Sequence, residues 1–181
     1  MTEAGYVFEI IAANVDELHD ECMSLHALTM ANAAAKARLI AAQHPERLVI
    51  GGDTLVAVDE CALTKPADMK EARTMLRRLA GRTHQVCTSV VLICVAAGVE
   101  KKFEVVTRVT FLPLTEAQMD EYLTLINPLD KAGGYAAQEH GDRIIARVEG
   151  SWTNVVGLPM EALAAELSAL GVLPKQKETG A

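Results

Sequence analysis

An aspartate inside an apolar stretch is the first residue of this sequence that could carry chemistry. Asp53 follows Ile-Gly-Gly at residues 50–52 and precedes Leu-Val-Ala-Val at residues 55–58, so the pattern predicts that its carboxylate is buried. A buried carboxylate is costly unless it is hydrogen-bonded, paired with a cation or bound to a metal. The two glycines would let another backbone or a ligand approach closely. Asp53 is therefore a candidate site residue, and an aspartate that caps a turn between two strands is the alternative.

A lysine is predicted to lie near this aspartate. If Asp59-Glu60 forms a hairpin turn, Thr54 is opposite Lys65, and opposed residues have Cβ atoms roughly 5 Å apart. Asp-Glu is a weaker turn signal than Asp-Gly. An exposed lysine at the end of a strand, before Pro66, is the alternative interpretation.

Two polar loops and a second lysine are the other features of interest. Residues 130–138 (Asp-Lys-Ala-Gly-Gly-Tyr-Ala-Ala-Gln) are too polar and flexible for a core strand, which indicates either a loop shaped around a ligand or an ordinary surface loop. Ser, Thr and Asn within residues 150–154 can line a polar pocket, although they are also common turn residues. Lys36 lies in an alanine-rich stretch, off its predicted apolar face, and by itself is interpreted as exposed.

Helices and strands in alternation must position these residues. The apolar spacing predicts a helix over residues 26–42, with an apolar face made of Leu28, Ala31, Ala35, Leu39 and Ala42. The other predicted elements are a strand over 48–58 with a kink at its glycines, strands over 86–97, 103–111 and 144–148, and helices over 66–79, 115–126 and 159–170. This order predicts one α/β domain on a mixed sheet, covering residues 1–173, followed by a flexible polar tail over 174–181.

Composition narrows the function classes. The chain has 181 residues, 50% of them hydrophobic, and its apolar runs are too short to span a membrane. The first residues lack the pattern of a secretory signal, so a cytoplasmic location is expected. The net charge of -7 argues against nucleic-acid polymers and anionic membranes as partners. Four scattered cysteines without ligand spacing favour reduced, buried thiols over a zinc or disulfide role.

Seven segments, taken together, resemble the Maf family over nearly the full chain. They are residues 14–17 (Asn-Val-Asp-Glu), the alanine-rich helix with Lys36, 50–56 (Ile-Gly-Gly-Asp-Thr-Leu-Val), 64–68 (Thr-Lys-Pro-Ala-Asp), 79–84 (Leu-Ala-Gly-Arg-Thr-His), 128–135 (Pro-Leu-Asp-Lys-Ala-Gly-Gly-Tyr) and 149–159 (Glu-Gly-Ser-Trp-Thr-Asn-Val-Val-Gly-Leu-Pro). Any one of them is a weak signal, and their order and spacing make the resemblance specific.

The resemblance implies a metal-dependent hydrolase that converts nucleoside triphosphates to the monophosphate and pyrophosphate. It implies an elongated, two-lobed α/β fold like that of inosine triphosphate pyrophosphatase, with a cleft between the lobes. By position, Asp53 would be the general base, Lys36 and Lys65 would contact the triphosphate, and Asp53 and Glu17 would hold Mg²⁺ or Mn²⁺.

The same resemblance implies which residues select the nucleobase of the substrate. Thr54 and Gln138 would lie where the family distinguishes its nucleotides, and the context of Gln138 resembles the branch acting on dTTP and UTP. One amide side chain offers both a donor and an acceptor, which suits the edge of uracil or thymine. The sequence does not fix the oligomeric state, and a homodimer is the default expectation.

The sequence departs from the family pattern in its N-terminal region. Members normally begin with a strand and a Ser-x-Ser-Pro-Arg-Arg loop that grips phosphates, whereas here no Arg precedes Arg38. Bidentate arginines are hard to replace in phosphate binding. Two expectations follow: the true start lies upstream and the native protein is a complete enzyme, or the chain is a catalytically impaired nucleotide-binding or cell-division-related protein.

Overall fold

The computed structural model describes residues 1–19, 23–59 and 61–175. Its strands are β1 (Val49–Val58), β2 (Cys61–Leu63), β3 (Thr83–Cys94), β4 (Val99–Phe111) and β5 (Ile145–Glu149). Its helices are α1 (Leu25–Gln43), α2 (Met69–Leu79), α3 (Glu116–Leu125), α4 (Trp152–Val156) and α5 (Met160–Ala169), with short 3₁₀ turns η1 (Pro128–Asp130), η2 (Ala132–Gly134) and η3 (Gly141–Arg143). All the predicted helices and strands are present, β2 is the second strand of the predicted hairpin, and α4 is additional.

One sheet runs the length of the molecule, with strand order β2-β1-β3-β4-β5. Every pairing among the described strands is antiparallel, so the expected mixture of strand directions is not found there. For β3 and β4 the reason is local, because the short connection from Cys94 to Val99 allows only an antiparallel pair, whereas parallel neighbours need long crossovers. The α/β class is confirmed, and β3 is the central strand of the sheet.

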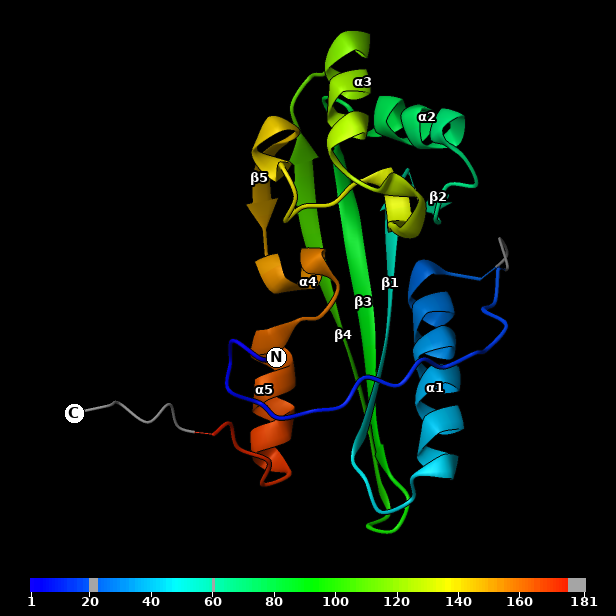
Figure 1. Cartoon of the computed structure of the whole chain (residues 1–181), viewed down its shortest axis with the longest axis vertical. Coiled ribbons are helices and arrows are strands. Elements are labelled where there is room, and N and C mark those ends of the chain that lie inside the picture. Colours follow the sequence, from blue (N-terminus) through cyan, green and yellow to red (C-terminus); the bar gives the residue numbers. More distant parts are fainter. Residues whose placement is uncertain (20–22, 60, 176–181) are drawn as a thin grey trace, which may run out of the picture.

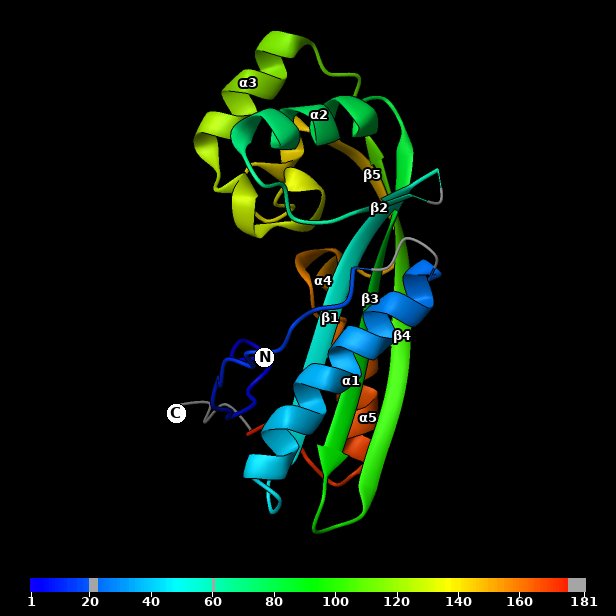
Figure 2. The ribbon, with the colours of Figure 1, turned by 90° about the vertical axis from the view of Figure 1, so that its right-hand side faces the viewer.

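The molecule is elongated and has two lobes, as expected from the family resemblance. In one lobe α1 and α5 cover opposite faces of the long strands, and in the other α2 and α3 pack at the far end of the sheet (Figures 1 and 2). Alternation along β3 explains the first lobe, because Val91 packs with the alanines of α1 while Val90 packs with Leu163 and Leu167 of α5. The second lobe has its own core around Leu76, with Phe111 and Tyr122 among its largest members.

Helix α1 forms where predicted, and Leu28 of its predicted apolar face is buried, but that face was otherwise misplaced. Its buried residues include Ala33, Ala37 and Ala41, whereas Ala35 and Ala42 are exposed. Alanine occurs on every side of this helix, so the sequence carries little signal about which side is buried. Small residues then decide the packing, because they allow α1 to lie close against β1.

Strand β1 is unbroken at its glycines, contrary to the predicted kink. Its pairing with β3 continues in one register from Val49 to Ala57. Gly51 instead serves the close approach of α1, since a Cβ at this position would lie 2.7 Å from the Ala33 carbonyl oxygen and 2.8 Å from the Ala37 nitrogen. The prediction that the glycines admit another backbone is therefore confirmed for Gly51.

The predicted hairpin register is also confirmed. Val56 pairs with Leu63 and Val58 with Cys61, which is the register that would place Thr54 opposite Lys65. The ladder ends at Leu63, so that last pair is not formed as strand structure.

The two ends of the described chain meet near α5. The Lys175 N–H donates to the Gly5 carbonyl at 2.9 Å, and residues 176–181 of the predicted tail lie outside the described residues. Within the part of the chain that is described, no helix is long and apolar enough to cross a membrane.

Replacing Gly51 by alanine tests the close contact between α1 and β1. The new methyl group would meet backbone atoms under 3.0 Å away, so we expect Gly51→Ala to lower the free energy of unfolding by about 3 kcal/mol. Gly52→Ala is the matched control, because its Cβ would meet only the Ser89 carbonyl at 3.8 Å. Urea unfolding measures both; equal losses in the two variants would contradict this packing.

Candidate active site

A cavity of about 660 Å³ opens beside β1, between the two lobes. It is lined by α1, by the middle of β1, by the loop before and after η2, and by the end of α4. All six residues predicted for the site line this one cavity: Glu17, Lys36, Asp53, Thr54, Lys65 and Gln138. The structure thus brings together residues from five separate segments of the chain.

An ammonium between two carboxylates is the electrostatic centre of this cavity. Lys36 Nζ lies 2.7 Å from Asp53 Oδ1 and 2.7 Å from Glu17 Oε1. The Lys36 side chain is only 21% exposed, so its interpretation as a surface lysine was wrong. This error follows from the misplaced apolar face of α1. The orientation of the helix that buries Ala33 and Ala37 also directs Lys36 toward β1.

Asn32 explains why Glu17 lies within reach. Its buried side chain accepts a hydrogen bond from the Leu18 N–H at 2.8 Å and donates to the Leu18 carbonyl at 3.3 Å. These two bonds attach the extended N-terminal segment to α1, one turn before Lys36. Asn32 was missed from the sequence, because nothing in the local pattern distinguishes a buried amide on an alanine-rich helix.

Burial and ion pairing act in opposite directions on the three charged groups. Burial raises the pKa of Asp53, and the hydrogen bond from Lys36 offsets only part of this effect. The hydrogen bond from Lys36 lowers the pKa of Glu17. Burial disfavours the charged form of Lys36, but hydrogen bonds to Asp53 and Glu17 raise its pKa overall. Asp53 is therefore more basic than an ordinary carboxylate.

One oxygen of Asp53 has an unused bonding capacity. Oδ2 is buried and lacks a hydrogen-bond partner among the described residues. An orphaned buried oxygen is costly, so a cation or a proton at this position would relieve that cost. Asp53 and Glu17 together offer the hard oxygen donors that Mg²⁺ and Mn²⁺ prefer, and the residues present fit such an ion.

Thr54 follows Asp53 on β1 and faces the other side of the sheet. Its hydroxyl lies 2.8 Å from that of Thr88 on β3 and donates to the Gly157 carbonyl at 3.3 Å. Helix α4 is held in turn by Asn154, whose amide donates to the Val86 carbonyl at 3.0 Å. The Ser-Trp-Thr-Asn segment (residues 151–154) thus holds α4 against the sheet, and residues 155–157 line the cavity.

Residues of the glycine loop line the cavity on both sides of Gly133 and Gly134. Gly133 and Gly134 have positive φ angles of 74° and 71°, which glycine adopts without strain. The adjacent Tyr135 is buried, and its hydroxyl lies 2.8 Å from His84 Nε2 on β3. Of the six predicted residues, Gln138 and Lys65 are exposed.

An α/β domain with a half-buried ammonium and a buried carboxylate beside a cavity is a typical arrangement for an enzyme acting on a charged ligand. A family model described as Maf-like protein matches residues 1–170. Proteins named dTTP/UTP pyrophosphatase are similar to this chain in several bacteria. The relative from Akkermansia muciniphila is 45% identical over 171 residues, covering 94% of this chain and 89% of the relative.

Two further relatives carry the same name. The protein from Myxococcus xanthus is 42% identical over 165 residues, with 91% of this chain and 83% of the relative covered. The protein from Bacillus cytotoxicus is 39% identical over 178 residues, with 98% and 88% covered. The chain belongs to the Maf family, as its sequence motifs predicted.

The contact between His84 and Tyr135 predicts a pH-dependent stability. Burial lowers the pKa of His84 from 6.5 to about 4, so the folded protein binds fewer protons than the unfolded chain between these values. Stability present above pH 6.5 should then decline as the pH falls toward 4, with a loss of roughly 2 kcal/mol between pH 7.5 and pH 5.

Urea unfolding of the protein and of His84→Gln at the two pH values measures this contribution. The variant is expected to be less stable at both pH values, but to lose less stability on acidification, because the other groups titrate in both proteins. An equal loss in the two proteins would contradict the assignment to His84.

Proposed function

We propose that this protein hydrolyses nucleoside triphosphates to the monophosphate and pyrophosphate, with dTTP and UTP as its substrates. The observation that carries the proposal is the buried Asp53 carboxylate, held by Lys36 in a cavity large enough for a nucleotide. The relatives named dTTP/UTP pyrophosphatase support the choice of substrate. The protein therefore acts as a hydrolase of nucleotide metabolism.

Asp53 acts as the general base in this proposal. Breaking a phosphoanhydride by water needs an acceptor for the proton of that water and fixed positive charge near the phosphate oxygens. The raised pKa of Asp53, caused first by burial, makes the carboxylate a better proton acceptor near neutral pH. Lys36 fixes its orientation through the 2.7 Å hydrogen bond.

Lys36 and Lys65 supply the positive charge. Both lysines line the cavity, Lys36 with a largely buried side chain and Lys65 with an exposed one, so both can contact a triphosphate. Asp53 and Glu17 would hold a divalent cation, Mg²⁺ or Mn²⁺. Such an ion, when bound, neutralises charge on the phosphate oxygens. The orphaned Asp53 Oδ2 supports this placement.

We assign selection of the substrate's nucleobase to Thr54 and Gln138. The Gln138 amide can donate and accept at the edge of a uracil or thymine base, and its exposed position on the wall leaves it free to do so. The Thr54 hydroxyl is engaged by Thr88 and Gly157, so Thr54 acts by fixing the shape of the wall. We place the enzyme in the cytoplasm and expect a homodimer as the default assembly.

A catalytically impaired nucleotide-binding protein is the less favoured alternative. A protein without catalysis has no need for a buried carboxylate with an unsatisfied oxygen, and that feature costs stability. The assembled set of Glu17, Lys36 and Asp53 therefore favours hydrolysis over binding alone.

Removing the charge of Asp53 tests the proposed base. Asp53→Asn keeps the size of the side chain but cannot accept a proton, so we expect the turnover number for dTTP to fall by about 100-fold to 10,000-fold. Pyrophosphate release measures this rate. Asp142→Asn is the control, because Asp142 is exposed in η3 and does not line the cavity. Normal turnover by a folded Asp53→Asn protein would show that another group activates the water.

A further inference from the structure

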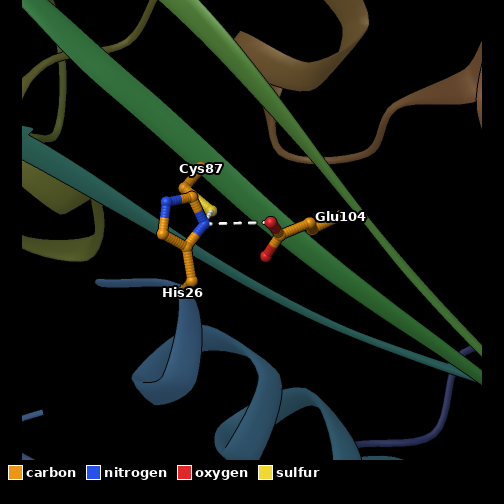
Figure 3. A group of neighbouring side chains, drawn as sticks. All are labelled: His26, Cys87 and Glu104. Carbon is orange, nitrogen blue, oxygen red and sulfur yellow. Dashed lines mark hydrogen bonds and ion pairs between the residues drawn. The ribbon is translucent and has the colours of Figure 1, made fainter. Parts of the chain in front are cut away.

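A second cluster of ligand-forming side chains lies on the face of the sheet that α1 covers. His26 comes from the first turn of α1, Cys87 from β3 and Glu104 from β4 (Figure 3). Glu104 pairs with Ser89, two residues along β3 from Cys87, so both side chains project from the same face. None of the three lines the nucleotide cavity.

The three ligand atoms are spaced as a metal ion requires. His26 Nδ1 lies 3.0 Å from Glu104 Oε1 and 3.7 Å from Cys87 Sγ, and all three atoms lie within 4.8 Å of one another. Zinc bonds of about 2.0 Å to nitrogen, 2.1 Å to oxygen and 2.3 Å to sulfur in a tetrahedron give edges of roughly 3.4–3.6 Å. The distances from His26 to its two neighbours differ from these edges by a few tenths of an ångström. Glu104 is 40% exposed at its side chain, so it has room to move into place.

We propose that His26, Cys87 and Glu104 form a zinc site with one coordination position left for water. One imidazole, one thiolate and one carboxylate are a donor set that Zn²⁺ accepts and Mg²⁺ does not. The site is therefore chemically distinct from the oxygen-only pair of Asp53 and Glu17. It also departs from the expectation that the cysteines have no metal role, since Cys87 and His26 are 61 residues apart in the sequence.

Binding requires the loss of one proton. Nδ1 must present its lone pair, so the neutral imidazole carries its proton on Nε2, and the Cys87 thiol releases its proton to the solvent. Because zinc binding releases this proton, zinc affinity should weaken as the pH falls.

A metal ion at this site would cross-link α1 to the sheet. His26 lies ten residues before Lys36 on the same helix, and the neighbouring Thr29 already bonds Ser89 of β3 at 2.8 Å. A metal that joins His26 to β3 and β4 would fix the N-terminal end of α1. It would thereby stabilise the helix that carries Lys36, without touching the nucleotide.

Zinc titration of the full chain tests the site. The measurement uses a Cys22→Ser background, so that a thiol outside the described residues does not contribute, and contains excess Mg²⁺ to occupy oxygen sites. We expect one Zn²⁺ per chain and a rise in melting temperature with zinc concentration. We also expect Co²⁺ in place of zinc to give a sulfur-to-cobalt charge-transfer band.

Variants of each ligand decide the outcome. Cys87→Ser should abolish the cobalt band, and His26→Asn, at a half-exposed position that tolerates substitution, should weaken zinc binding by at least about tenfold. His44→Asn and Cys61→Ser are matched controls of the same residue types outside the cluster, and both should bind zinc normally. Equal zinc affinity in His26→Asn and the parent protein, or no cobalt band in the parent, would overturn the proposal.

Discussion

The Lys36 ammonium lies between the carboxylates of Asp53 and Glu17, and the site depends on this contact. Asp53 is 8% exposed, so without a cation its charge would be too costly to keep at this depth. Lys36 can reach it only if α1 lies directly on β1. That approach in turn requires Gly51, since any side chain there would collide with the backbone of α1. The need to pair the buried charge of Asp53 therefore constrains how closely α1 packs on β1.

The rest of the fold serves to close a cavity around this contact. Asn32 brings Glu17 to Lys36 from the N-terminal segment, and Gly157 and Thr88 fix Thr54 on the other face of β1. The glycine loop is attached to β3 through Tyr135 and His84. These supports come from distant parts of the chain, and each is a buried or partly buried polar contact of the kind that specifies one arrangement over another.

Much of this was predictable from local patterns. Asp53 could be identified as a carboxylate within an apolar run, and the turn residues predicted the register of the β1–β2 hairpin. One pair of adjacent glycines indicated the cavity loop, and another indicated the close contact at Gly51. Most of the buried face of α1 was not predictable, because alanine occurs on every side and only two large residues, Leu28 and Ile40, mark the core. Lys36 was misjudged as exposed for that reason. Contacts such as Thr54 with Gly157, 103 residues apart, or His26 with Cys87 depend on topology and leave no trace in spacing.

Product analysis with this chain, Mg²⁺ and a panel of nucleoside triphosphates is the most direct test of the proposed hydrolysis. We expect dTTP and UTP to yield equal amounts of monophosphate and pyrophosphate. Purine nucleotides should react more slowly, because Gln138 matches a pyrimidine edge. Release of orthophosphate and a diphosphate would contradict the proposed pyrophosphatase reaction, and equal rates for every nucleobase would contradict the proposed role of Gln138.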